Sequence, residues 1–479
     1  MILPAHLSAQ KTFSFWQVSL LFLLLIGWFL WLLNVGVEAA MAFAFFCTLL
    51  KLALCIYGIC LVTLSITGGG REVHVARSDL ATLDRKTLPL YTILIPLYKE
   101  AELLPRLTSR LTALDYPIDK LEVILLLEAD DAKTIVAVEK VPLPPHFHVL
   151  IVPAGYPKTK PRACNMGLVH ARGQFLVIYD AEDQPDPDQL MKALIAFQRS
   201  NEQVICVQSR LNFYNPRQNL LTRLFTLEYS HWFDLILPAL SAIDAPIPLG
   251  GTSNHFRTSA LKAIGGWDAF NVAEDCDLGI RLFTAGYRAI IVNSTTWEEA
   301  NSQLGNWIRQ RSRWIKGYLQ TYIVHMRNPS ALFRNLGWRN FLGFQLIVGG
   351  TPLVLFLAPI LWLLMLASRT TQLEAFEQIV AWRLPEYIHS FELISLVFSI
   401  FTCFYFGLCG ALVRGNYDLA KYVLLTPLYG ALQSVAAWKG CFQLLTKPHH
   451  WEKTTHGLFP LTLVRQATSC QWSNFRQRQ

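Results

Sequence analysis

The chain has 479 residues, of which 52% are hydrophobic and 16% charged, and its formal net charge is +8. So apolar a composition argues against a set of ordinary soluble domains and favours a membrane protein. The Lys and Arg residues lie mainly beside apolar segments and in the C-terminal tail, without a basic stripe of interleaved aromatic residues, so we expect no nucleic acid as a partner. Ten Cys residues without a CxxC pair predict neither a disulfide framework nor a zinc site.

Two apolar runs, 13–33 and 40–66, lie near the start of the chain. A helix needs about 20 apolar residues to cross a bilayer, so each run is long enough to span one. The first run is too long for a cleavable signal peptide. Residues 1–70 therefore predict a transmembrane hairpin. Basic residues follow it and indicate that the next domain is cytosolic: Arg71, Arg77, Arg85 and Lys86.

Short apolar runs alternate with helical patterns between residues 71 and 305. The strand-like runs are YTILIPL, LEVILLLE, HFHVLIV, FLVIY and QVICVQSRL. Continuous apolar strands that alternate with helices predict a mostly parallel, Rossmann-like α/β sheet covered on both faces. Ligands bind such sheets beyond the carboxyl ends of the strands, so the acidic residues found there are candidates for a binding site.

Two of these strands end in clusters of carboxylates. Asp130 and Asp131 follow LEVILLLE and form either a solvated turn or hydrogen-bond acceptors for a nucleobase or ribose. Asp180, Glu182 and Asp183 follow FLVIY, where clustered negative charges repel one another unless a cation neutralises them. Mg²⁺ or Mn²⁺ held by one or two carboxylates and by substrate phosphates is the usual solution.

A basic segment separates the two acidic clusters. Lys158, Lys160 and Arg162 stand just before a helix-like run. Basic side chains and backbone N–H groups at the start of a helix suit an anionic ligand. A solvated basic loop explains the segment equally well.

The segment NVAEDCDLGIRL, residues 271–282, places Glu274, Asp275 and Asp277 in front of an amphipathic run. The pattern predicts a helix that begins near Asp275. Asp is a preferred helix N-cap, so a structural role is the alternative to a catalytic one. Three acidic residues are more than a single cap requires.

A basic amphipathic helix is predicted within residues 306–340, and it contains Gln310, Arg313 and Trp314. Lys and Arg opposite Trp and Tyr are typical of a helix that lies on a membrane surface. An indole can also stack on the apolar face of a sugar ring, and a guanidinium can neutralise a departing diphosphate. Both roles are open to this helix.

Three apolar runs follow, at 341–367, 391–413 and 422–445, within a C-terminal transmembrane region at 341–446. If all three crossed the bilayer, the basic tail at 447–479 would lie outside, against the positive-inside rule. We therefore expect that one run does not cross. The last run, which contains Pro427 and Lys439, is one candidate, and the Gly349 and Gly350 break in the first run leaves the choice open.

These motifs, in this order, resemble processive membrane glycosyltransferases of family 2, such as cellulose and hyaluronan synthases. The resemblance is strongest over residues 88–319. GGTSNHFR, GGWDAFNVAEDCDLGIRLFTAGYR and PHHWEKTTHG look most like the bacterial branch that includes the phage-adsorption protein NfrB. The sequence lacks an RxxxR segment followed by DxSxxG, so we expect no PilZ domain.

The resemblance implies a GT-A domain at 71–305, inserted between N- and C-terminal transmembrane helices on the cytosolic side of the cytoplasmic membrane. It implies inverting transfer, from a nucleotide-sugar such as a UDP-sugar, onto a growing glycan acceptor. The product would be a β-linked polysaccharide exported across the membrane, among membrane lipids and with room for an accessory export subunit. The alternative is a single transfer that makes a glycolipid or a lipid-linked sugar.

Carried over position by position, the resemblance also implies roles for individual residues. The base would be Asp275, and the acceptor would be held by Glu274, Gln310 and Trp314. The donor would be bound by Asp130, Asp131, Lys160, Asp180 and Arg313. The Mg²⁺ or Mn²⁺ ligands would come from Asp180, Glu182 and Asp183. A gating loop in the tail would contain Trp451, Lys453 and Thr454.

Overall fold

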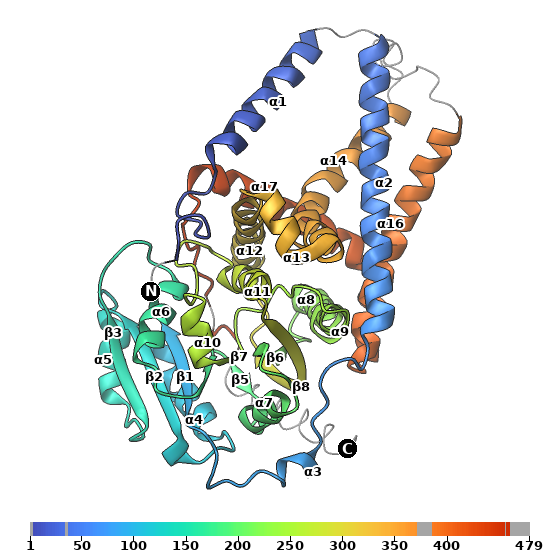
Figure 1. Cartoon of the computed structure of the whole chain (residues 1–479). Helices are drawn as coiled ribbons and strands as arrows, with labels where there is room; N and C mark the ends of the chain where they lie inside the picture. The colour runs from blue at the N-terminus through green and yellow to red at the C-terminus, as the bar shows by residue number, and fades with distance from the viewer. Residues whose placement is uncertain (1–2, 34–36, 371–385, 456, 460–479) are drawn as a thin grey trace.

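A computed structural model of the chain describes residues 3–33, 37–370, 386–455 and 457–459. A domain built on one sheet lies at one end of the molecule, and the long apolar helices project from it (Figure 1). The predicted tail from residue 460 onward lies outside the described residues.

Eight strands form the sheet, in the order β3-β2-β1-β4-β7-β6-β8-β5. The first four are parallel to one another, and β6 is parallel to β8. Strand β7 is antiparallel to both of its neighbours, and β5 is antiparallel to β8. The prediction of a mostly parallel sheet is confirmed. The strands are β1 (Tyr91–Leu97), β2 (Leu121–Glu128), β3 (Phe147–Val152), β4 (Phe175–Ile178), β5 (Gln184–Pro185), β6 (Val204–Phe213), β7 (Asn254–Arg257) and β8 (Arg288–Glu298).

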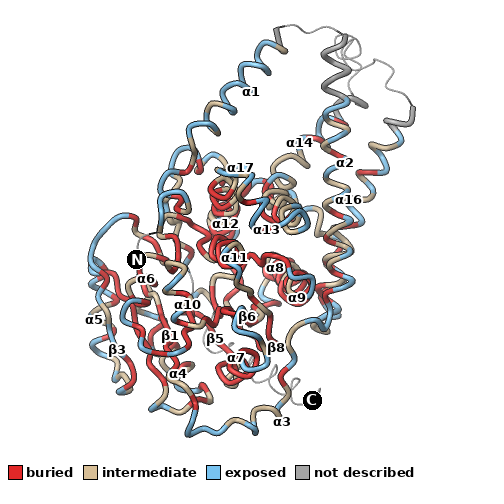
Figure 2. Tube along the Cα trace, viewed as in Figure 1, coloured by how far each residue is buried: buried red, intermediate tan, exposed pale blue. Residues whose placement is uncertain are grey.

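Helices cover both faces of the sheet, and this explains the continuous apolar strands. All eight residues of β2 are buried, and two separate hydrophobic clusters lie on the two faces. Figure 2 shows the burial concentrated around the sheet, whereas α1 is largely exposed. The helices of this domain are α3 (Arg77–Leu80), α4 (Leu104–Thr112), α5 (Ala132–Lys140), α6 (Lys160–His170), α7 (Gln189–Gln198), α8 (Leu220–His231), α9 (Leu237–Ala242), α10 (Thr258–Ala263) and α11 (Glu274–Thr284), with short turns η1 (Ala101–Leu103), η2 (Ile118–Lys120) and η3 (Trp232–Ile236).

Among the described residues, three helical stretches are long and apolar enough to cross a membrane: Phe45–Gly68, Pro329–Leu366 and Ser390–Val413. The apolar part of α1 found among the described residues, Phe15–Trp31, is shorter. The elements that form this region are α1 (Phe15–Leu33), α2 (Val37–Gly68), α12 (Leu304–His325), α13 (Pro329–Phe344), η4 (Gln345–Gly350), α14 (Thr351–Thr370), α16 (Glu386–Val413), η5 (Tyr417–Leu425) and α17 (Thr426–Thr446).

Helix α17 contains most of the last apolar run but is not among the candidate spans. It packs along the amphipathic helix α12 instead. Their approach is close because Gly440 has no side chain: a Cβ there would lie 2.8 Å from the carbonyl oxygen of Ser312. That one C-terminal run does not cross stays a prediction.

Candidate active site

Most of the predicted site residues line one cavity of about 710 Å³. They come from the start of α6, the loop after β4, the start of α11, helix α12 and the segment after α17. The predicted residues in the lining are Lys160, Asp180, Glu182, Glu274, Asp275, Gln310, Arg313, Trp314 and Trp451. Those outside the lining are Asp130, Asp131, Asp183, Lys453 and Thr454.

The loop after β4 is held in shape by Asp183. Its Oδ2 accepts the backbone N–H of Asp180, with 2.7 Å from N to Oδ2, and the hydroxyl of Thr252. Asp183 is only 1% exposed. It therefore shapes the loop that presents Asp180 and Glu182, and only those two of the three predicted metal ligands reach the cavity.

Among the described residues, no three His, Cys, Asp or Glu side chains are arranged to hold a metal ion. The local charge nevertheless favours a cation. Burial, and then the charge of Asp183 and its acidic neighbours, raises the pKa of Glu298 well above its usual range. Lys160 pairs with Asp180 at 2.5 Å from Nζ to Oδ1. Asp180 and Glu182 thus fit a Mg²⁺ or Mn²⁺ ion whose shell is completed by phosphate oxygens.

The other acidic cluster lies beyond β1 and β2. The side chain of Asp131 is buried, where it accepts the N–H of Thr134 at the start of α5 and the N–H of Lys99. Asp130 is exposed, and its Oδ1 accepts a hydrogen bond from Lys158 Nζ at 2.6 Å. The Lys158 ammonium also lies 3.8 Å from the centre of the Tyr98 ring. Asp131 therefore supports the turn, and Asp130 is the carboxylate that a ligand can reach.

Helix α11 begins at Glu274, which places Asp275 in its first turn. Ala273 occupies the N-cap position, so the structural alternative in which Asp275 is the cap is wrong. The carboxylate of Asp275 instead accepts the N–H of Cys276, at 2.8 Å from N to Oδ1. Backbone N–H groups and the helix dipole favour a negative charge at this position.

The two adjacent carboxyls of α11 differ in their environments. Burial, and then the charge of Asp275, raises the pKa of Glu274 to about 8. Burial also raises the pKa of Asp275, but the Cys276 N–H and the cations Lys160 and Arg313 oppose that effect. Of the two carboxyls, Asp275 is thus the one whose ionised form its neighbours stabilise more, which is what a general base requires.

The raised pKa of Glu274 predicts how pH affects stability. The ordinary value is 4.5, so between pH 4.5 and about 8 the folded protein holds a proton that the unfolded chain releases. Over this range the contribution of Glu274 to the free energy of unfolding falls as the pH rises. Glu274→Gln is therefore expected to raise Tm, relative to the unmodified protein, more at pH 8 than at pH 5. The exposed Glu139→Gln is the control, and an equal gain at both pH values would contradict the prediction.

Asp277 has a structural role in the same helix. It is fully buried and pairs with Arg281, at 2.6 Å from Nε to Oδ2, and with His325, at 3.1 Å from Nε2 to Oδ1. Burial opposes ionisation, but Arg281 and then His325 lower the pKa of Asp277 overall. The third acid of the motif thus fixes α11 against α12 and is not a candidate base.

Replacing Asp277 by Asn is expected to lower the free energy of unfolding by about 3–5 kcal/mol, because it leaves the Arg281 guanidinium buried without its ion-pair partner. Unfolding by denaturant in detergent would measure the change. Asp119→Asn, at an exposed turn, is the matched control. A loss as small as that of the control would show that the buried pair does not hold the two helices.

Helix α12 presents the other predicted residues. Gln310 Oε1 accepts a hydrogen bond from Asn301 at 2.9 Å. The Arg313 guanidinium lies 4.2 Å from the centre of the Trp451 ring, and its buried Nε has no hydrogen-bond partner among the described residues. Trp314 lines the cavity with its ring plane at 26° to that of Tyr229. The helix thus brings an incompletely paired cation and an indole to the same cavity.

The segment after α17 runs across this site. Its backbone N–H groups at Gly457 and Phe459 donate to the Glu299 carboxylate at 2.7 and 2.8 Å. Lys453 Nζ donates to Glu100 Oε1 at 2.8 Å, and Thr454 is buried. Only Trp451 of the predicted gating residues lines the cavity, while Lys453 fastens the segment at its edge and the buried Thr454 hydroxyl has no hydrogen-bond partner among the described residues.

Sequence reasoning missed two acids in the lining, Glu298 and Glu299. Glu298 is the last residue of β8 and Glu299 follows it, but the polar residues NSTT separate these acids from the apolar run AIIV, so the signal used elsewhere was weak here. Glu228 and Arg311, on α8 and α12, also line the cavity. No sequence motif distinguishes them from ordinary helix surface residues.

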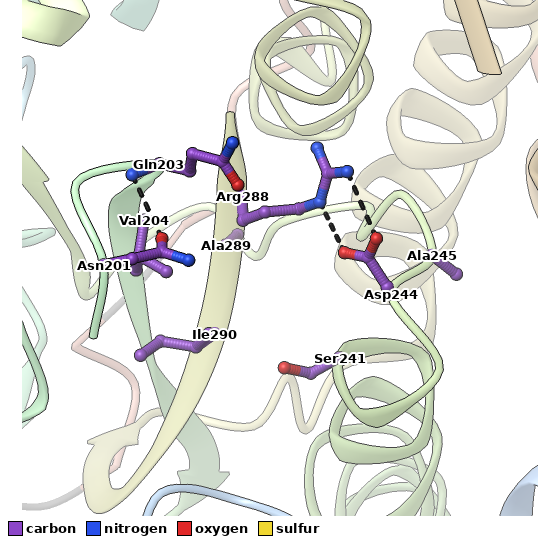
Figure 3. Close-up of a pocket in the computed structure, with 9 residues that line it drawn as sticks. All are labelled: Asn201, Gln203, Val204, Ser241, Asp244, Ala245, Arg288, Ala289 and Ile290. Atoms are coloured by element: carbon purple, nitrogen blue, oxygen red, sulfur yellow. Dashed lines mark hydrogen bonds and ion pairs between the residues drawn. The ribbon is translucent and has the colours of Figure 1, made fainter. Parts of the chain in front are cut away.

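A second hollow, of about 340 Å³, lies where β6 and β8 begin (Figure 3). Arg288 pairs there with Asp244, from NH2 to Oδ2 at 3.1 Å. It contains none of the predicted residues. In a parallel pair the acids that follow the strands lie at the other end, so this hollow is separate from the candidate site.

Comparison with known proteins gives a family match over residues 175–412, to "Glycosyl transferase family group 2". The probable glycosyltransferase YdaM of Bacillus subtilis (strain 168) is 27% identical over 253 residues, which are 50% of this chain and 57% of that protein. Probable glucomannan 4-beta-mannosyltransferase 7 of Oryza sativa subsp. japonica is 30% identical over 241 residues, 49% of this chain and 41% of that protein. The chain thus spans about half the length of these curated relatives.

Among solved structures, the mannosyltransferase PcManGT from Pyrobaculum calidifontis, in complex with GDP-Man and Mn²⁺, is 20% identical. The match has a TM-score of 0.47 and covers 85% of this chain and 97% of that one. The family match includes the loop after β4, the start of α11 and all of α12, which carry most of the predicted residues that line the cavity. Residues 175–412, just under half of the chain, thus match a glycosyltransferase family 2 domain.

Proposed function

We propose that the protein is an inverting, processive glycosyltransferase that makes a β-linked polysaccharide and exports it through its membrane helices. The observation that carries this proposal is the shape of the cavity. It contains Asp180, Asp275 and Arg313, and it continues between α2, α14 and α16, where Tyr57 and Trp362 are part of its wall. One cavity thus joins a site suited to a diphosphate to the helices that are candidates to cross the membrane.

The donor half of the site would bind a nucleotide-sugar. Asp130, beside Lys158 and Tyr98, would accept hydrogen bonds from the nucleoside. Asp180 and Glu182 would hold Mg²⁺ or Mn²⁺, which would neutralise negative charge on the diphosphate. The Arg313 guanidinium, and Lys160 from the start of α6, would bind the same phosphates as they leave.

The acceptor half of the site would supply the base. Asp275 would take the proton from an acceptor hydroxyl as that oxygen attacks the anomeric carbon, and the bond from this carbon to the diphosphate would break on the opposite face. Glu274, protonated, and Gln310 would hydrogen-bond the acceptor sugar, and Trp314 would stack against it. Trp451 would close the site as part of a gating loop that includes Thr454 and that Lys453 anchors.

Several finer features of the proposal come from the resemblance. These are the likeness to the branch that includes NfrB, a UDP-sugar donor, an accessory export subunit, and a multi-pass position in the cytoplasmic membrane with the catalytic domain in the cytosol. Because these relatives are named as mannosyltransferases, nucleotide-linked mannose is a further donor to test.

The purified protein should release nucleotide from one member of a panel of UDP- and GDP-sugars when Mg²⁺ or Mn²⁺ is present. Product size then separates the two forms of the proposal. A ladder of increasing length on a gel indicates repeated transfer, whereas a single added sugar indicates the alternative, a glycolipid or lipid-linked sugar. A protein that turns over none of the donors would contradict both.

A further inference from the structure

A polar cluster lies in the wall of the same cavity, away from the catalytic acids. Its centre is the Glu228 carboxylate of α8, whose side chain is 30% exposed. Glu228 Oε2 accepts the Tyr429 hydroxyl at 2.7 Å, and its Oε1 accepts the Gln433 amide at 2.9 Å. Arg311 forms an ion pair with the same carboxylate. Three helices, α8, α12 and α17, therefore fix one acidic group that faces the cavity.

This cluster lies between the sheet and the candidate membrane helices. Helix α8 packs on β6 of the sheet and also on α16, one of the candidate spans. The adjacent residue, Tyr229, stacks on Trp314 of the site, with 6.1 Å between the ring centres. Glu228 is thus next to a residue of the reaction site, on the element that connects that site to the membrane region.

Packing alone does not account for this cluster. Apolar side chains of similar size would join three helices at least as well as a charged pair, which must first lose its water. The Glu228 side chain is 30% exposed, and Glu228 and Gln433 both line the cavity. A carboxylate and an amide, held at 2.9 Å from each other by a hydrogen bond, are therefore together in its wall.

Arg311 helps to fix the orientation of the Glu228 carboxylate. Its guanidinium lies 4.8 Å from the centre of the Trp314 ring and 4.7 Å from that of Phe225. The cation is therefore held by aromatic rings on one side and by Glu228 on another. The cluster is connected in this way to the indole that would stack on the acceptor, so the two are suited to act on one bound chain.

We propose that Glu228 and Gln433 form a binding subsite for a second sugar ring of the acceptor, beyond the ring that reacts. The ligand class is an oligosaccharide whose adjacent hydroxyl groups donate to the carboxylate and to the amide carbonyl. This inference rests on the proposed function, and it favours a glycan acceptor over a lipid with a single reacting hydroxyl or phosphate. Neighbouring sugar hydroxyls match a fixed carboxylate because each of its oxygens can accept more than one hydrogen bond.

The test compares acceptors of different length. With the donor that the panel identifies, kcat/KM is measured for a monosaccharide glycoside and for β-1,4-linked tetrasaccharides of mannose and of glucose. The ratio of kcat/KM for the better tetrasaccharide to kcat/KM for the monosaccharide glycoside is expected to exceed one in the unmodified protein. It should fall about tenfold in Glu228→Gln, as the loss of a hydrogen bond to a charged group implies, and less in Gln433→Met. Most of the change should be in KM.

Glu139→Gln, on the exposed face of α5, is the matched control and should leave the ratio unchanged. Tm identifies a variant that has failed to fold, and Gln433→Met keeps the Arg311 ion pair intact and so tests the subsite independently. Donor turnover with a ratio that neither variant lowers overturns the subsite, as does a protein that uses polyprenyl phosphate but gains nothing from the tetrasaccharides. Absence of donor turnover in the unmodified protein overturns the proposed function and the subsite with it.

Discussion

Replacing Asp275 by Asn is expected to lower the rate of sugar transfer by roughly 10²–10⁴-fold, the contribution of a well-placed general base. Asn has nearly the same shape but cannot accept a proton from the acceptor hydroxyl. The hydrogen bond from the Cys276 N–H can be kept by the amide oxygen, so the first turn of α11 should be preserved. Incorporation of radiolabelled sugar by the purified variant measures the loss.

Two controls separate catalysis from folding in this variant. Asp119→Asn, at an exposed position, should transfer at the normal rate. Binding of the donor, measured by calorimetry, should be nearly the same with and without the Asp275→Asn change. Transfer by the variant at close to the normal rate would exclude Asp275 as the base, and Glu274 and Glu298 would then be the acids to test.

Replacing Asp180 by Asn is expected to lower transfer by about 10²–10³-fold, the range for removing one group that stabilises charge in the transition state. The change removes one of two carboxylates that fit the metal ion and frees Lys160 from its ion pair. Asp180→Asn therefore combines two effects: it lowers the affinity for the metal ion, and it removes the group that positions the Lys160 ammonium near the diphosphate. The rate should recover in part at higher Mn²⁺ concentration.

Removing the metal with a chelator should also lower the rate of sugar transfer by the unmodified protein. Titration with Mg²⁺ or Mn²⁺ should then restore the rate, with a higher midpoint in Asp180→Asn. Asp183→Asn offers a contrast, because that buried side chain holds the loop and does not line the cavity. It should reduce Tm together with the rate. A protein that keeps its full rate after chelation would contradict the assigned role of Asp180 and Glu182.

The general form of the catalytic domain could be predicted because the pattern is local. An apolar run such as LEVILLLE can be buried on both faces only inside a covered sheet, and β2 is buried throughout. Strands β7 and β8 were not predicted. β7 has four residues, and the apolar run of β8, AIIV, is followed by the polar residues NSTT, so neither shows a long continuous apolar run. Their pairing depends on the rest of the sheet.

The candidate site was predictable as a set of strand ends but not residue by residue. The sequence shows the acids of each cluster as equivalent neighbours, yet Asp180 reaches the cavity and Asp183 turns inward to Thr252. The same is true of Asp130 and Asp131, one exposed and one hydrogen-bonded to a helix start. Which oxygen meets a backbone N–H depends on the path of the loop, and this is decided by contacts distant in sequence.

The membrane region shows a similar limit. Length and hydropathy identify three candidate spans, but only packing shows that α17 lies against α12. Tyr429 and Gln433 reach Glu228 from α17 as a result, across about two hundred residues of sequence. A helix counted as a simple span would have placed these polar residues in lipid.

The most direct test of the central claim is donor binding by the purified protein in detergent, measured by calorimetry with and without Mg²⁺ or Mn²⁺. We expect one nucleotide-sugar to bind at a single site per chain when the metal is present, and binding to weaken strongly in a chelator and in Asp180→Asn. If no UDP- or GDP-sugar binds under any of these conditions, the cavity at the strand ends is not a donor site, and the assignment of its carboxylates is wrong.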